Sequence, residues 1–176
     1  DDVVGGAGLD PSLPVGCNGT LIRQGSTVMV DLCGNFTGYM TDMSRTFSVG
    51  QIPELAHRAH ATSRAIHEAL RAMARPGVAA SEMYNTAYEM AAKAGLSDYF
   101  MGYTQHAGFI GHGVGIEINE SPVLAPRSRD ILAAGNIIAI EPKFVIPGTG
   151  AVGVENTYLV TENGMECLTN FKEDII

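Results

Sequence analysis

The chain has 176 residues, of which 45% are hydrophobic, and a formal net charge of −8 at pH 7. This size and apolar content are typical of one globular domain with a substantial core. The excess of acids disfavours nucleic acid and anionic membranes as partners, and neither a signal-peptide pattern nor an apolar run of about 20 residues is found. Three cysteines without metal-finger spacing predict reduced thiols in a cytoplasmic protein.

The first half of the chain is predicted to form strands and then a helix. Residues 18–49 are typical of short strands, with turns at Asn35 and Gly38. Pro53 favours a helix start, and apolar side chains then recur at helical spacing as far as Met73, where a Pro-Gly pair follows. His57, His60 and His67 lie on or beside this helix. A His-x-x-His spacing also fits a metal pair, but we expect His60 and His67 on an exposed face.

The second half begins with another helix and continues with strands. Ser81 is expected to cap this helix, which extends to about Ala94 and ends at Gly95. Strands are then expected at 107–117, 136–146 and 152–170.

Five side chains have the chemistry of metal ligands. They are four carboxylates and one imidazole: Asp31, Asp42, His112, Glu141 and Glu155. Oxygen-rich sets with one histidine suit divalent ions such as Mn, Co, Fe or Zn. Four carboxylates carry too much charge for one ion, but they suit two ions that share bridging oxygens roughly 3.5–4 Å apart. These residues therefore predict a two-metal hydrolase.

The four acids occur in two similar arrangements. Asp31 and Glu141 each end an apolar run, and a glycine-containing return then leads to Asp42 or Glu155, each close to a Thr-aromatic pair. A carboxylate at the end of a buried strand has no obvious partner. The repetition predicts two duplicated halves with a shared site. His112 lies between glycines, which allow the backbone to approach this site closely.

Another interpretation of each single acid is a strand-end cap or half of an ion pair. Lysine and arginine total only 11 against 19 acids, so the acids cannot all be paired. Cys33 lies two residues from Asp31 and is expected near the site. A nucleophilic role for Cys33 is disfavoured because no His or Asn partner is evident nearby.

The five residues in this order resemble the metal site of the pita-bread metallopeptidases, which include methionine aminopeptidases, aminopeptidase P and Xaa-Pro dipeptidases. The resemblance runs from about Gly5 to the C-terminus, and both Arg45-Thr46-Phe47 and the segment 159–169 look more like the Xaa-Pro branch. It implies an α+β pita-bread fold with pseudo-twofold duplicated halves, in which outer helices surround a curved antiparallel sheet.

The resemblance also implies a role for each ligand. Asp31 would bind one ion, and Asp42 and Glu155 would bridge both. His112 and Glu141 would bind the other ion, and Glu141 would also move a proton during catalysis.

Four departures from the family pattern bear on substrate and rate. Asn119 stands where the family usually has a histidine; it is a candidate catalytic residue that can hydrogen-bond a substrate carbonyl but cannot carry a proton near neutral pH. Gly153 stands where Xaa-Pro peptidases tend to have arginine. No histidine lies in the leader segment 12–16, where prolidases usually have one. His106 lies six residues before His112 instead of four, so an accessory catalytic role and a surface position both remain open.

We therefore expect one catalytic domain over residues 1–176, trimmed at its N-terminus because only a short leader precedes Asp31. The expected function is a metal-dependent exopeptidase that cleaves Xaa-Pro bonds with a hydroxide activated by two divalent ions. Mn or Co is expected first, with Zn or Fe as alternatives, and the resemblance implies a homodimer. Two other functions stay open: a catalytically weak binding module, and a hydrolase of a non-peptide C–N bond.

Overall fold

The computed structural model describes residues 19–176, so the leader segment 12–16 and Cys17 lie outside the described residues. In chain order the elements are β1 (Thr27–Phe36), β2 (Tyr39–Ser48), α1 (Glu54–Met73), α2 (Ala80–Lys93), the 3₁₀ helix η1 (Ser97–Tyr99), β3 (Gly111–Gly113), β4 (Ile137–Ile140), β5 (Lys143–Ile146), β6 (Gly150–Gly153), β7 (Asn156–Thr161) and β8 (Gly164–Cys167). The pairs formed by these strands are all antiparallel. The predicted α+β class is confirmed.

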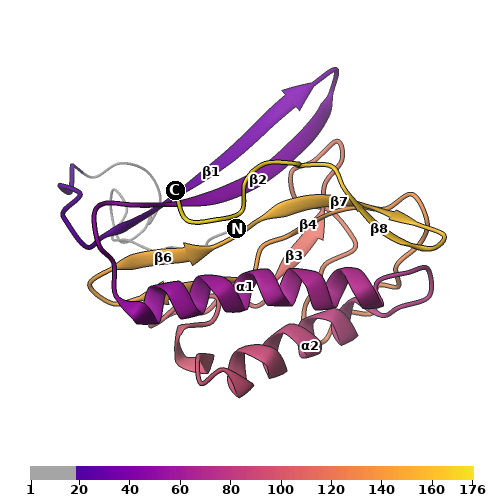
Figure 1. Ribbon diagram of the computed structural model, residues 1–176. Helices are drawn as coiled ribbons and strands as arrows, with labels where there is room; N and C mark the ends of the chain where they lie inside the picture. The colour runs from indigo at the N-terminus through magenta and orange to yellow at the C-terminus, as the bar shows by residue number, and fades with distance from the viewer. Residues whose placement is uncertain (1–18) are drawn as a thin grey trace.

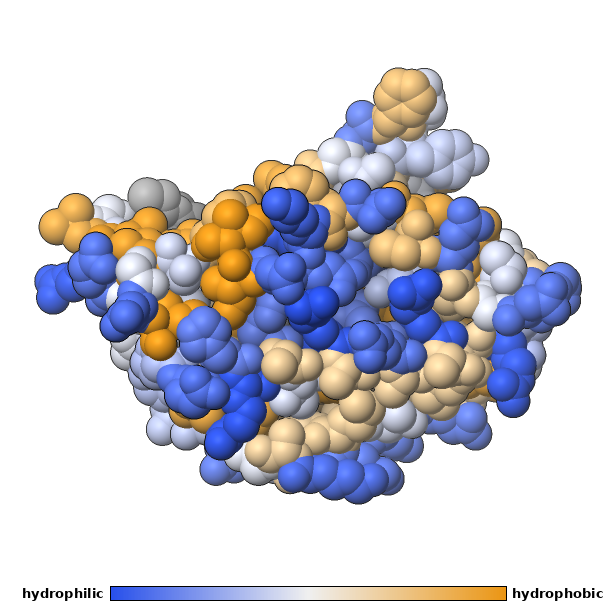
Figure 2. Space-filling model, in the orientation of Figure 1, coloured by the Kyte–Doolittle hydropathy of each residue, from blue (hydrophilic) through white to orange (hydrophobic). Residues whose placement is uncertain are grey.

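The β1–β2 hairpin projects from the rest of the molecule (Figure 1). Its register pairs Phe36 with Tyr39, so Thr37 and Gly38 form the turn. Their φ angles of 53° and 93° are the positive values that a two-residue hairpin turn requires. Phe36 and Tyr39 are 77% and 63% exposed, and Figure 2 shows this end of the hairpin standing clear of the surface. The turn is exposed, but the hairpin is joined to the body directly beside it, where the Met40 amide donates to the Gly115 carbonyl at 2.7 Å.

The two helices lie side by side along one side of the molecule (Figure 1). As predicted, α1 follows Pro53 and α2 ends shortly before Gly95, whose φ is 69°. The prediction that Ser81 caps α2 is wrong, because Ala79 is the N-cap residue, without a side-chain hydrogen bond, and Ser81 lies inside the first turn. No helix in the described part of the chain is both long and apolar enough to cross a membrane.

The prediction of an exposed face for His60 and His67 is wrong, because they are only 4% and 2% exposed. His57, by contrast, is exposed. Both lie on the buried face of α1 beside Ile66 and Leu70, since residues three, four and seven apart share one side of a helix. His67 lies within hydrogen-bonding distance of the Tyr158 hydroxyl and the Val154 carbonyl, and burial lowers its pKa to about 4. These histidines are part of the interior.

Four strands form a sheet in the order β3-β4-β7-β8, and β5 pairs with β6. Two predicted strands are each interrupted at a glutamate: Glu141-Pro142 separates β4 from β5, and Val154-Glu155 separates β6 from β7. Proline has no N–H to continue a ladder, which accounts for the first break. Both glutamates therefore lie where regular pairing stops. The helices pack on these strands through a core that includes Leu70, Met83, Ile138, Phe144 and Tyr158.

Candidate metal centre

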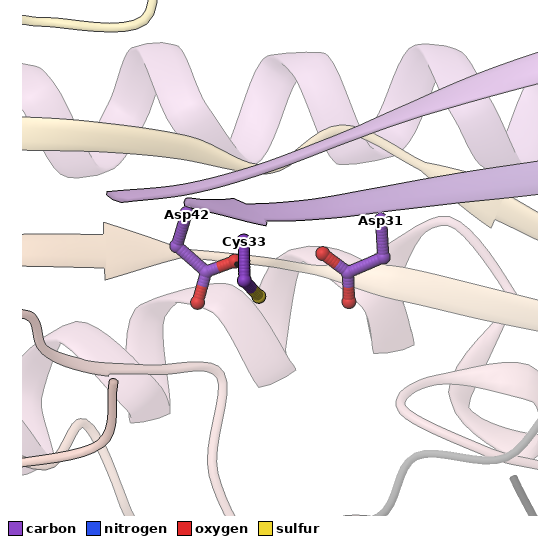
Figure 3. A group of neighbouring side chains, drawn as sticks. All are labelled: Asp31, Cys33 and Asp42. Carbon is purple, nitrogen blue, oxygen red and sulfur yellow. Dashed lines mark hydrogen bonds between the residues drawn. The ribbon is translucent and has the colours of Figure 1, made fainter. Parts of the chain in front are cut away.

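The hairpin presents two carboxylates on one face. Cys33 lies directly opposite Asp42 in the β1–β2 register, and Asp31 lies two residues before Cys33. Because alternate residues of a strand share a face, as do directly opposed residues, the three side chains project together (Figure 3). The expectation that Asp31 ends its strand is wrong, since β1 continues to Phe36. Strand alternation, and not a strand end, directs Asp31 into the site.

His112 connects the hairpin with the four-stranded sheet. It lies in β3, and its Nε2 is 3.7 Å from Asp42 Oδ2 and 3.5 Å from Glu141 Oε1. Its Nδ1 is 3.0 Å from the Gly113 carbonyl oxygen. A carbonyl only accepts hydrogen bonds, so Nδ1 is the donor, and in the neutral ring with this proton Nε2 has the free lone pair. This is the tautomer that ligates a metal through Nε2.

The glycines beside His112 have a steric reason. A Cβ at Gly111 would collide with the Ala139 carbonyl oxygen, and one at Gly113 would collide with the Ser121 carbonyl oxygen. Gly111 pairs with Ile140 in β4, directly before Glu141, and the Glu141 amide donates to the Ile110 carbonyl at 2.9 Å. The close approach that the sequence predicted is therefore present, and it sets His112 beside Glu141.

Glu155 is held by the middle of β2. The Ser44 hydroxyl donates to Glu155 Oε2 at 2.6 Å, and the Glu155 amide donates to the Ser44 carbonyl at 3.2 Å. The Arg45 guanidinium donates to the Glu155 carbonyl at 2.7 Å and to the Asn156 side chain at 2.8 Å. The Thr157 hydroxyl adds a 2.7 Å bond to the Asp42 carbonyl. These bonds fix the position of Asp42, the second acid of the first half, relative to Glu155, the second acid of the second half.

Ser63 on α1 supports both glutamates from behind. Its hydroxyl donates to the carbonyl of Pro142, the residue after Glu141, at 2.5 Å. The same oxygen accepts from the amide of Val154, the residue before Glu155, at 3.1 Å. One buried hydroxyl thus joins the two strand breaks that carry these ligands.

Lys143 is a part of the site that the sequence interpretation missed. Its ammonium lies 2.5 Å from Glu141 Oε2, and its side chain is buried. Lys143 opposes Gly153 in the β5–β6 pair, and a Cβ at Gly153 would lie only 2.9 Å from Lys143 Cα. Gly153, where an arginine was expected by resemblance, therefore allows the β6 backbone to approach Pro142 and Lys143 closely. The available signal was a lysine in the otherwise apolar run that follows Pro142.

The electrostatics of the site favour a bound cation. Burial, followed by the charge of Asp31, raises the pKa of Asp42 to about 6. Burial, and then the charges of Glu141 and Asp42, raise the pKa of Glu155 well above its ordinary value. Burial would lower the pKa of Lys143, but the neighbouring carboxylates outweigh it and raise that pKa. One ammonium is too little for four carboxylates, so ionising all of them requires further positive charge.

The donor atoms also have the spacing of a metal site. One ligand atom from each of Asp42, His112 and Glu155 lies within 4.8 Å of the others, and the same is true of Asp31, Cys33 and Asp42. Asp42 belongs to both groups, as a bridging ligand would. Carboxylate and imidazole donors at this spacing fit divalent ions.

The accessory residues His106 and Asn119 lie on the surface. His106 is exposed, and its Nδ1 lies 2.7 Å from the Phe100 carbonyl oxygen, six residues earlier in the chain. Asn119 is also exposed, and its neighbour Glu120 pairs with Gly113, directly after His112. Asn119 is therefore near the ligand segment in the fold. A catalytic contribution of His106 or Asn119 stays a prediction.

Several known proteins are similar to this chain in sequence. The chain is 33% identical to the uncharacterized peptidase YqhT of Bacillus subtilis and 32% identical to the Xaa-Pro dipeptidase of Pyrococcus furiosus. Each alignment covers 99% of this chain but only 48% or 49% of the relative, so the chain spans about half the length of these proteins.

Solved structures give the same result for the fold. The prolidase of Pyrococcus horikoshii superposes with a TM-score of 0.82 at 30% identity, over 93% of this chain and 45% of that one. A methionine aminopeptidase of Thermotoga maritima superposes with a TM-score of 0.71 at 25% identity, over 90% of this chain and 70% of that one. The predicted pita-bread fold is confirmed. Since the profile of metallopeptidase family M24 matches residues 4–162, this chain belongs to that family.

Proposed function

We propose that this chain forms a dinuclear metal centre and hydrolyses peptides whose second residue is proline. The observation that carries the proposal is the convergence of two hairpin carboxylates with His112, Glu141 and Glu155 from the other sheet segments. Asp31 and Asp42 would hold one ion, and His112 and Glu141 the other. Asp42 and Glu155 would bridge them. Mn or Co is the first expectation for the ions, with Zn or Fe as alternatives.

The protein side chains and the ions would have separate tasks. Bound ions would activate water and polarise the scissile carbonyl. Glu141 would accept the proton that the attacking water releases and pass it to the leaving nitrogen, while Lys143 keeps its carboxylate oriented. Lys143 would also offset one negative charge of the cluster. Ser44 and Arg45 would keep Glu155 oriented while substrate binds.

The substrate class is inferred from the named relatives. Two relatives, from Pyrococcus furiosus and Pyrococcus horikoshii, are named Xaa-Pro dipeptidases. This chain spans about half the length of each, so the substrate of the whole protein is a proposal. Residues 1–176 would act as one catalytic domain, and a homodimer is the expected assembly. Light scattering of the purified protein measures that assembly directly.

The test is hydrolysis after controlled metal loading. The protein is stripped with a chelator, reloaded with Mn, Co or Zn, and offered Xaa-Pro dipeptides, longer Xaa-Pro peptides and Met-peptides. Metal-dependent cleavage of Xaa-Pro substrates is the expected result. Glu141→Gln should abolish it, whereas Glu162→Gln, in the exposed turn after β7, is the matched control and should not.

Two outcomes would change the proposal. Cleavage of Met-peptides alone would keep the metal centre but reassign the substrate. Two bound ions without cleavage of any peptide would favour a binding module or a non-peptide C–N substrate.

A further inference from the structure

Cys33 lies in the proposed metal centre, and packing in the core does not explain its position there. It is exposed, and it lies on the face of the hairpin that carries both carboxylates. Figure 3 shows its sulfur between the carboxyl groups of Asp31 and Asp42. By contrast Cys167, the other described cysteine, is partly buried against the core and lies 3.9 Å from the Thr169 hydroxyl.

The distances place the sulfur among the donor atoms. Cys33 Sγ is 3.3 Å from Asp42 Oδ1, and the thiol donates to that oxygen. Ligand atoms of Asp31, Cys33 and Asp42 all lie within 4.8 Å of one another. Asp42 independently belongs to the group with His112 and Glu155. The sulfur therefore borders an ion position that other ligands already define.

We propose that Cys33 is a further ligand of the ion held by Asp31 and Asp42, an inference that rests on the metal centre proposed above. On binding, the S–H bond breaks, the proton passes to solvent and a sulfur–metal bond forms, with no change of oxidation state. A nearby divalent ion deprotonates a coordinating thiol, and the ion replaces the thiol proton between sulfur and Asp42.

This ligand makes the two ion positions chemically different. A thiolate is a soft donor that favours Zn, Co or Cd over Mn, whereas carboxylate and imidazole donors are less selective. The hairpin position would therefore discriminate against Mn, and the position at His112 and Glu141 would not. The protein would take up two unlike ions more readily than an enzyme with oxygen and nitrogen donors alone.

Cobalt spectroscopy tests the proposal without any assay of turnover. The metal-free protein is titrated with Co(II), the bound cobalt is counted by mass spectrometry, and near-ultraviolet absorption is recorded. A sulfur-to-cobalt charge-transfer band should appear in the wild type and in the controls Cys167→Ser and Cys17→Ser. It should be absent from Cys33→Ser, whose preference for Co over Mn should fall at least 10-fold.

The outcomes separate this inference from the proposed function. Two bound cobalt ions without a charge-transfer band in the wild type, or an unchanged band in Cys33→Ser, would overturn the role of Cys33 alone. Failure of the wild type to bind cobalt would overturn the metal centre as well. Cobalt should also slow the reaction of Cys33 with a thiol reagent, and equal rates with and without cobalt would contradict ligation.

Discussion

The two sides of the metal centre are built differently. On the hairpin side, Asp31 and Cys33 are exposed and depend for their position on the register of β1 and β2. On the sheet side, His112, Glu141 and Glu155 are buried and have hydrogen bonds or ion pairs behind them. The difference teaches that contacts behind the side chains orient one side, while Asp31 and Cys33 on the other depend on strand register.

The largest effect is expected from Glu155→Gln on the sheet side. The amide keeps an acceptor for Ser44 but removes the charge of a proposed bridging ligand. Turnover and metal affinity should fall by more than roughly 100-fold, because loss of a hydrogen-bond partner of a metal ligand alone can cost that much. Isothermal titration and kinetics measure both quantities. If Glu155→Gln bound two ions normally, the sheet side would not contain a bridge.

Lys143→Met should mainly affect the metal-free protein. Its removal leaves Glu141 buried without its cation, which typically costs about 3 kcal/mol of unfolding free energy. Bound divalent ions should restore most of this loss. Urea denaturation with chelator and with metal measures both states. Lys93→Met, which removes an exposed helix pair with Glu89, is the control and should change stability by less than about 1 kcal/mol.

Ser44→Ala tests whether orientation of a ligand matters on the sheet side. Loss of its hydrogen bond to Glu155 should weaken metal binding by roughly 10-fold, the lower end of the range for such partners. Ser48→Ala, at the far end of β2, should leave affinity unchanged. Equal affinities of the two variants would mean that packing alone orients Glu155.

The smallest effect is a pH dependence centred on His67. Its pKa is lowered to about 4 by burial, against an ordinary 6.5, so its neutral form stabilises the fold above pH 6.5. That stability is lost as pH falls from 6.5 to 4, and His60, whose pKa is also lowered to about 4, acts in the same direction. Thermal melts should show a shallower acid loss for His67→Gln than for the wild type. His57→Gln, at an exposed position, should follow the wild type.

The sequence was informative wherever a local pattern had one physical cause. Proline and glycine marked the helix ends. The register of β1 and β2 follows from the two-residue turn formed by Thr37 and Gly38. The candidate ligand residues were recognisable because carboxylates interrupt apolar segments. The structure brings together Asp42, His112 and Glu155, which come from separate elements.

The sequence was misleading wherever burial depends on partners far along the chain. His67 is polar and helical, which favours the surface, yet Tyr158 and Val154 supply hydrogen bonds from β7 and its approach. Lys143 was missed because its partner Glu141 had already been assigned to a metal. The close approach of Gly153 to Lys143 depends on the β5–β6 register, which no short motif encodes.

The hydroxyl of Ser63 affects which sizes of ion the proposed site can hold. By joining the residue after Glu141 to the residue before Glu155, it keeps the separation of these two ligands nearly constant. A larger or smaller ion therefore cannot be accommodated by moving the glutamates apart or together. The Asp42 backbone is also tied to Thr157, so the adjustment falls to the exposed side chains of Asp31 and Cys33 on β1.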